Sequence, residues 1–234
     1  MPTPFATSCN HAISQGGCDV RKRSHTQHFV TAMSTETLLG GNKYNVVYEQ
    51  STPEVYDEWA KDGYDAAIAQ NPATGSVAAV LVRLVSGTGL VALDAGCGTG
   101  LVVEACRAAL GNEISLTCDG IDYSAGMLEV AAKKGQYRKL FQADLTKPLE
   151  ELADASYQCV LSSGTFLQGH IGPEALPELC RVLCTGGFMV FSVRPTFFEE
   201  KRDDFLSTLE LNGMRDIVVD MLSYAKGKGD GDEP

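Results

Sequence analysis

The sequence predicts an α/β fold in which helices cover both faces of a doubly wound, mostly parallel sheet. From about residue 90 onward, short apolar runs alternate with helical stretches, a pattern typical of parallel strands joined by crossover helices. The first of these runs closes in a glycine-rich turn at residues 96–100, and the next ends in an acid, Asp122. Both features fall where open α/β sheets bind their ligands, beyond the carboxyl ends of the strands.

The individual elements follow from apolar runs, caps and breakers. Thr52-Pro53-Glu54 predicts a helix start with a hydroxyl cap and a proline in the first turn, and Ser124 predicts the cap of a later helix. We expect strands over residues 90–94, 114–121, 139–143, 157–162, 188–193 and 217–222. We expect helices from residue 53, through 64–68, and over 77–85, 101–110, 125–134, 173–183 and 197–211.

Composition limits the partners and cofactors. The chain has 234 residues, of which 44% are hydrophobic, enough for the core of one domain. Its formal net charge of −11 disfavours nucleic acid as a partner, because phosphate binding depends on Lys and Arg. No apolar run approaches the roughly 18 residues of a transmembrane helix, so we expect no membrane partner. The eight cysteines form no CxxC pair, so no metal site is predicted.

The two ends of the chain differ from its middle. We predict a disordered or targeting extension over residues 1–45, the α/β domain over 46–225 and a flexible tail over 226–234. The first 35 residues are rich in Ser, Thr and His, with three basic residues against one acid, as in organelle transit peptides. They lack the continuous apolar stretch of a secretory signal. The prediction is a cytoplasmic location, with organellar import through residues 1–35 as the alternative.

The glycine-rich turn is the strongest functional signal. Gly96, Gly98 and Gly100 permit positive φ angles and let a ligand approach the backbone. A dinucleotide fingerprint has the spacing GxGxxG, which would put its third glycine at Leu101. That spacing serves a pyrophosphate on the helix N-terminus, so the departure favours an adenosyl ligand without phosphate. A nicotinamide-dependent oxidoreductase is the rival among enzymes.

Three further strand ends carry candidate ligand-binding residues. Asp122 can accept hydrogen bonds from both hydroxyls of a ribose, whereas Asp119 lies earlier in the same strand. Asp144 can accept from an adenine amino group while Leu145 backs the ring, although an acid in a loop is usually a turn former. The small residues from Ser162 onward leave room for a substrate or serve packing.

A base and an aromatic group complete the candidate site. His170 follows the fourth strand of the domain and is the candidate catalytic base, with a turn-forming histidine as the alternative. Tyr56, Trp59 and Tyr64 can close over a sulfonium through cation–π contacts or pack their rings on the core. Arg194 can meet an acidic substrate or pair with a carboxylate.

From Asp94 to Val193 the ordered motifs resemble those of class I S-adenosylmethionine-dependent methyltransferases. The resemblance rests on Leu93-Asp94-Ala95-Gly96-Cys97-Gly98-Thr99-Gly100, Asp119-Gly120-Ile121-Asp122, Met127-Leu128 and Asp144-Leu145-Thr146. It implies a Rossmann-like methyltransferase fold, S-adenosylmethionine as co-substrate without a metal, and an N-terminal aromatic helix lying over it as a lid. The expected cofactor-binding residues are Tyr56, Trp59, Asp94, Ala95, Gly96, Cys97, Gly98, Gly100, Asp122, Tyr123, Met127, Asp144, Leu145 and Ser162.

One departure from this family bears on activity. Such domains usually finish with an antiparallel strand beside the fifth, whereas only residues 217–222 follow the last helix as a clear strand. We therefore expect that final antiparallel strand to be missing, which would expose a sheet edge. The predicted function is methyl transfer to an unidentified small-molecule or protein acceptor, with the oligomeric state open. The alternative is a catalytically weak pseudoenzyme or partner subunit that binds the cofactor.

Overall fold

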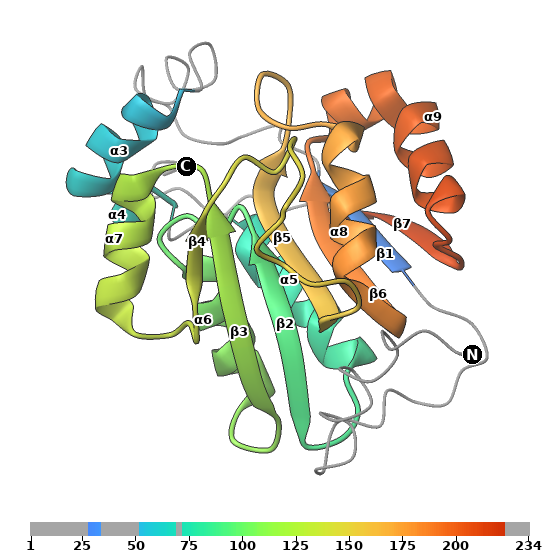
Figure 1. Ribbon diagram of the computed structural model, residues 1–234, viewed down its shortest axis with the longest axis horizontal. Coiled ribbons are helices and arrows are strands. Elements are labelled where there is room, and N and C mark those ends of the chain that lie inside the picture. Colours follow the sequence, from blue (N-terminus) through green and yellow to red (C-terminus); the bar gives the residue numbers. More distant parts are fainter. Residues whose placement is uncertain (1–27, 34–51, 69–71, 223–234) are drawn as a thin grey trace, which may run out of the picture.

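The computed structural model describes residues 28–33, 52–68 and 72–222 and contains one seven-stranded sheet. The strand order is β4-β3-β2-β5-β6-β1-β7, and every neighbouring pair is parallel (Figure 1). The strands are β1 His28–Met33, β2 Gly89–Ala95, β3 Ser115–Asp122, β4 Leu140–Gln142, β5 Tyr157–Phe166, β6 Leu183–Val193 and β7 Ile217–Leu222. The predicted doubly wound α/β fold is confirmed.

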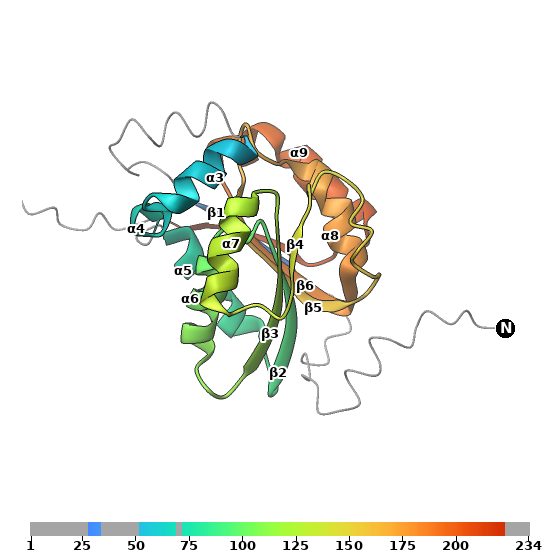
Figure 2. The ribbon, with the colours of Figure 1, turned by 60° about the vertical axis from the view of Figure 1, so that its left-hand side comes forward.

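Helices cover both faces of this sheet. They are α3 Pro53–Lys61, α4 Tyr64–Ile68, α5 Pro72–Leu84, α6 Leu101–Leu110, α7 Ala125–Lys134, α8 Leu176–Val182 and α9 Pro195–Leu211, with a 3₁₀ turn at Pro173–Ala175. Figure 2 shows α5, α6 and α7 on one face and α8 and α9 on the other. The helices α3 and α4 lie instead over the edge where the strands end (Figure 1).

The core is split by the sheet into two apolar layers. Successive side chains of β5 point to opposite faces, so Val160 packs with Phe191 and Phe205, while Leu161 packs with Leu81 under α5 and α6. All five residues are buried. Because both faces of β5 are covered here, its residues 159–161 are all apolar and buried, as expected for a central parallel strand.

The caps that begin α3 and α7 differ from each other. The Ser124 hydroxyl accepts a hydrogen bond from the Met127 amide, 3.0 Å away, and caps α7 as predicted. Thr52 is the N-cap of α3 as predicted, but the predicted capping bond is wrong, because its hydroxyl bonds to the Glu54 side chain and makes no capping hydrogen bond to the helix backbone. The start of α3 therefore rests on Pro53 and on the contacts that this helix makes with the rest of the domain.

The sheet contains a strand that the sequence patterns did not indicate. Residues His28–Met33 form β1, which pairs with β6 over 29–32 and with β7 over 28–33, parallel to both. The family's final antiparallel strand, which we expected to be missing, would lie beside β6. In this protein a parallel strand from the N-terminal part of the chain fills that place, between β6 and β7. The remainder of the predicted extension and the predicted tail after residue 225 lie outside the described residues.

This arrangement predicts that stability depends on β1. Deleting residues 1–33 removes the strand and unpairs both of its neighbours, whereas deleting residues 1–27 retains it. We expect the longer deletion to lower the free energy of unfolding by at least about 3 kcal/mol, since each backbone hydrogen bond contributes about 0.5–1.5 kcal/mol net. Urea unfolding followed by circular dichroism measures this. Equal stability of the two truncated chains would contradict the strand assignment.

Candidate active site

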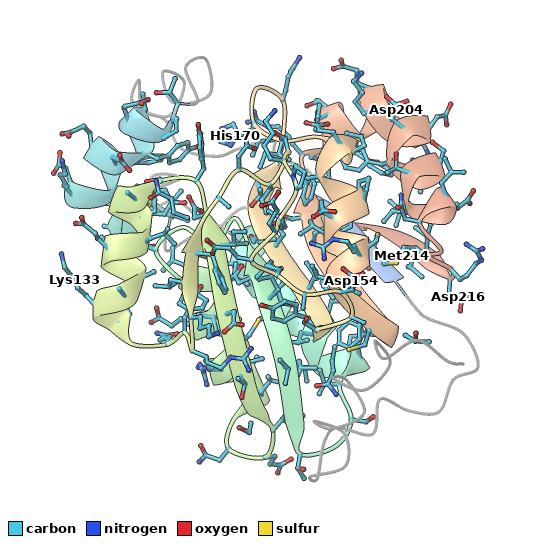
Figure 3. The ribbon with its side chains drawn as sticks, viewed as in Figure 1. Lys133, Asp154, His170, Asp204, Met214 and Asp216 are labelled. Carbon is cyan, nitrogen blue, oxygen red and sulfur yellow. The ribbon has the colours of Figure 1, made fainter. Side chains whose placement is uncertain are left out.

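The candidate site lies along the carboxyl edge of the sheet, beneath α3 and α4. A cavity of about 350 Å³ extends from the glycine turn to the ends of β3, β4 and β5, within the usual range for small-molecule sites. A smaller recess of about 60 Å³ opens from it between the glycine turn and the aromatic side chains of α3 and α4. Figure 3 shows His170 at this edge, between α3 and the end of β5.

The glycine turn forms one wall of the cavity. Gly96, Gly98 and Gly100 have φ angles of 71°, 52° and 93°, a region that favours glycine. The Gly96 and Cys97 amides both donate to the Ile121 carbonyl at the end of β3, at 2.9 and 3.0 Å. A Cβ on Gly96 would come within 2.2 Å of the Thr165 hydroxyl. The turn is therefore fixed between two neighbouring strands, with its backbone exposed to the cavity.

Asp122 joins this turn to the end of β3. One carboxylate oxygen accepts from the Gly98 amide at 2.8 Å and the other from the Ser124 amide at 2.9 Å. Burial raises the pKa of this carboxyl, while the bonds from these amides act in the opposite direction. The side chain lines the cavity, and each oxygen retains a lone pair for a further donor. Asp122 thus shapes the turn and presents an acceptor to the cavity.

Asp119 is excluded from this site by its own partners. Both of its oxygens accept from the Arg138 guanidinium, at 2.9 and 2.6 Å, and one also accepts from the Tyr157 hydroxyl at 2.9 Å. Its side chain is only 2% exposed. The preference for Asp122 over Asp119 therefore agrees with the geometry.

The far end of the cavity is formed by the loop after β4. Asp144 accepts from the Thr146 amide and hydroxyl through one oxygen, at 2.8 and 2.7 Å, as a turn-forming acid does. Its carboxylate still lines the cavity together with Leu145, Met127 and the exposed ring of Tyr123. One oxygen of Asp144 thus shapes the loop, as the turn-forming alternative predicts, while its contact with an adenine amino group stays a prediction.

Four expected cofactor residues support the cavity without lining it: Asp94, Ala95, Gly100 and Ser162. The Ser162 hydroxyl donates to the Ala95 carbonyl at 2.7 Å and thereby ties β5 to the end of β2. Asp94 is completely buried and accepts from the Tyr137 hydroxyl at 2.7 Å through one oxygen, while its other oxygen has no partner among the described residues. Burial raises the pKa of Asp94 to about 7.

The lid, which we define as helices α3 and α4, is held by carboxylates at separate points. Asp57 accepts from the Ser124 hydroxyl at 2.6 Å and from the Gly126 amide at 2.8 Å. Asp65 of α4 accepts from the Thr99 hydroxyl in the glycine turn and pairs with Lys134 at 2.7 Å. Neither acid was singled out from the sequence, because their partners lie 34 to 69 positions further along the chain.

A row of rings covers the recess from the lid side. Tyr56 and Trp59 lie 6.2 Å apart between ring centroids, and Trp59 meets Tyr64 edge to face at 4.8 Å. The Tyr56 hydroxyl lies 3.0 Å from His170 Nε2, and the two rings are also in edge contact. These aromatic side chains pack on the cavity and not on the core. Tyr64, which the sequence analysis placed with these rings, lines both spaces, and the larger cavity is also lined by Ser163, Gly164 and Thr165.

His170 is neutral at physiological pH. Burial lowers the pKa of its imidazole to about 4, and the positive charge of Arg194 adds to that effect. A neutral imidazole can exchange a proton at Nε2, the nitrogen that faces Tyr56. His170 also lies in a turn, since its amide donates to the Leu167 carbonyl at 3.1 Å, and its role as the catalytic base stays a prediction.

The fold and this site together define a methyltransferase. The profile of the methyltransferase domain family matches residues 93–191, from the end of β2 to β6. The chain is 32% identical over 172 residues to human methyltransferase-like protein 27, a match that covers 70% of this chain and 68% of that protein. The chain therefore belongs to the S-adenosylmethionine-dependent methyltransferases.

Solved structures that are similar to this chain include two methyltransferases. A TehB-like methyltransferase from Corynebacterium glutamicum gives a TM-score of 0.49 at 21% identity, covering 69% of this chain and 84% of that one. A methyltransferase from Aquifex aeolicus gives 0.48 at 17% identity, covering 70% and 89%.

Two features are absent from the described residues. No helix there is long and apolar enough to cross a bilayer. In the same part of the chain, no group of three or more His, Cys, Asp or Glu side chains is arranged to hold a metal ion.

We predict that Asp122→Ala weakens S-adenosylmethionine binding by about 1–3 kcal/mol, because charge-assisted hydrogen bonds to the ligand and to the Gly98 amide are lost together. Calorimetric titration measures the affinity, and thermal unfolding checks that the fold persists. Asp122→Asn is the matched control. It keeps one oxygen acceptor, so its affinity for S-adenosylmethionine should lie between those of the unmodified protein and Asp122→Ala. An affinity unchanged in Asp122→Ala would remove this residue from the site.

We also predict that lid docking weakens in acid. The Ser124 hydroxyl, and then the Gly126 amide, lower the pKa of Asp57 because they bond its charged form. Docking is therefore complete above the ordinary aspartate pKa of about 3.9 and is lost as pH falls through the lowered value. The part of cofactor release that depends on Asp57, measured as the difference between the unmodified chain and Asp57→Asn, should stay constant from neutrality to about pH 4 and change below it, whereas Asp122, whose pKa is raised, acts at higher pH.

Trp59, the chain's one tryptophan, lies in the lid and reports its opening by stopped-flow fluorescence. Asp57→Asn should release the cofactor several-fold faster at pH 7 and respond less to acid. Glu58→Gln is the control, because the neighbouring Glu58 is exposed and bonds to Lys61 of the same helix. Identical release from both variants would show that Asp57 does not hold the lid.

Proposed function

We propose that this protein transfers a methyl group from S-adenosylmethionine to an unidentified small-molecule or protein acceptor at the cavity beneath α3 and α4. The observation that carries the proposal is the convergence of a backbone-lined glycine turn with the carboxylates of Asp122 and Asp144 on one cavity. These groups match a ligand with two ribose hydroxyls and an adenine amino group. Tyr56, Trp59 and Tyr64 add aromatic faces suited to a sulfonium.

The residues present fit this co-substrate. Asp122 would hold the ribose and Asp144 the adenine amino group, with Leu145 and Met127 against the ring. The turn at Gly96 and Gly98 would present its backbone to the methionine part, since both glycines line the cavity and Gly96 packs too closely on Thr165 to carry a side chain. Cys97 contributes packing and not a nucleophile, because burial raises the pKa of its thiol well above the usual value.

The co-substrate supplies an activated methyl group, so the protein's task is mainly to position the acceptor and exclude water. Correct orientation can contribute roughly 7–11 kcal/mol to a reaction barrier. The lid closes the site from one side, through Asp57, Asp65 and Tyr56. The neutral His170 can take the acceptor's proton at Nε2, directly or relayed through the Tyr56 hydroxyl. Its low pKa keeps the imidazole unprotonated before the reaction but also makes it a weak base, so the proton passes on quickly to solvent.

The alternatives have less support. A pseudoenzyme was suggested by the expected loss of a strand beside β6, and β1 fills that place. An oxidoreductase would use a third glycine at position 101, where Leu101 begins α6. The location of the protein in the cytoplasm, with organellar import through residues 1–35 as the alternative, stays a prediction.

The test uses methyl-labelled S-adenosylmethionine, the full chain and a cell extract. We expect stoichiometric binding of the co-substrate, followed by transfer of label to an acceptor. Gly98→Val is the matched negative control, because a branched side chain at φ +52°, with its Cβ 3.7 Å from the Tyr64 hydroxyl, would obstruct the cavity. Uptake of labelled NAD without any of S-adenosylmethionine would reject the proposal.

A further inference from the structure

A second cavity adjoins the site on the side away from the lid. This outer cavity, of about 520 Å³, lies between the loop at residues 167–174 and one face of α9. His170 and Ile171 line both cavities, so the two meet at the candidate base. Figure 3 shows Asp204 on α9, across the carboxyl edge from α3. The volume is enough for a small molecule that reaches His170 from outside while the lid stays docked.

One face of α9 forms the outer wall. Phe197, Lys201, Asp204 and Thr208 recur at spacings of four, three and four residues, which places them on one side of a helix. The helix departs from regular geometry at Lys201, whose φ and ψ are −114° and 17°. The kink therefore falls in the wall of the cavity, where a change of helix direction alters the shape of the space.

The charges on the walls favour a cation. Lys201 Nζ lies 3.6 Å from Asp204 Oδ2 in an exposed ion pair, which offsets one of the two negative charges on the walls but leaves the Asp204 carboxylate accessible to a bound cation. Across the cavity, Glu174 accepts from the Gly172 amide at 2.9 Å through one oxygen and carries the remaining negative charge. The ring of Phe197 adds an aromatic face for an ammonium group. The net charge of −11 on the whole chain attracts cations and repels anions over a longer range.

The end of the outer cavity at His170 lies near a positive charge. The positive charge of Arg194 acts on His170, so a cationic group is disfavoured beside the imidazole. A cationic acceptor would consequently lie with its charged end toward Glu174 and Asp204 and its uncharged end at His170. The negative charges of Glu174 and Asp204 at one end of the outer cavity and the positive charge of Arg194 near the other thus orient the acceptor before any reaction.

We infer that the outer cavity is the acceptor site and selects a small amine-bearing molecule, held by Glu174, Asp204 and Phe197, whose uncharged nucleophilic nitrogen or oxygen lies at His170. This inference rests on the proposed methyl transfer. The accepting atom forms a bond to the methyl carbon with its lone pair, and the carbon–sulfur bond breaks with its electron pair remaining on sulfur. The proton of the accepting atom passes to His170 and then to water.

The first test is binding to protein saturated with S-adenosylhomocysteine. The probes are tyramine, tyrosol and 3-(4-hydroxyphenyl)propionate, which share a phenol and end in a cation, a neutral group and an anion. We expect tyramine to bind at least tenfold more tightly than the anion, and Glu174→Gln combined with Asp204→Asn to abolish that preference. Asp203→Asn is the matched control, because this exposed neighbour does not line the cavity. Equal affinity for tyramine and the anion, tighter binding of the anion, or no binding of any probe would overturn the inference.

The second test sorts a small-molecule extract by ion exchange into cationic, neutral and anionic pools, each supplied with methyl-labelled S-adenosylmethionine. Label should appear in the cationic pool and fall at least tenfold in the double variant, with co-substrate affinity unchanged by calorimetry. Label confined to the neutral or anionic pool, or absent from all three while the co-substrate binds, overturns the acceptor assignment. Failure to bind S-adenosylmethionine or S-adenosylhomocysteine at all would instead reject the proposed function.

Discussion

The hydrogen bond from the Gly98 amide to Asp122 is the interaction on which the rest of the site depends. It joins the turn after β2 to the end of β3, two strands already held in register from Gly89 with Ser115 to Ala95 with Ile121. Because the Gly96 and Cys97 amides also donate to the end of β3, the turn cannot move apart from the sheet. One carboxylate thus fixes the shape of the turn and presents acceptors to the same cavity.

The lid extends this principle to elements that are distant in sequence. Asp57 completes the N-terminus of α7, where helix amides lack partners and favour a negative charge. Asp65 bonds to Thr99 inside the glycine turn, and Tyr56 meets His170. The helices that cover the cavity are therefore attached to the residues that form it. Movement of the lid must also release the turn and the candidate base, which couples access to the site with its geometry.

The sequence predicted those features that local patterns determine. The glycine turn, Asp122 and the Ser124 cap each follow from a few adjacent residues, and the structure has all three in the predicted elements. Strand β1 could not be predicted in this way, because its place is set by pairing with β6 and β7, more than 150 positions away. Asp57 and Asp65 look like ordinary surface acids until their partners across the fold are known.

The outer cavity shows the same limit for function. Its walls come from the loop after β5 and from α9, and the kink at Lys201 has no proline or glycine nearby to announce it. The cavity beneath the lid is formed by the backbone of the glycine turn and by the carboxylates of Asp122 and Asp144. These features are compatible with many different methyl acceptors. Charge in the outer cavity depends on side chains such as Glu174, which can vary without disturbing the glycine turn. Under the proposed assignment, acceptor choice is separable from cofactor binding, because among the described residues the two cavities share only His170 and Ile171.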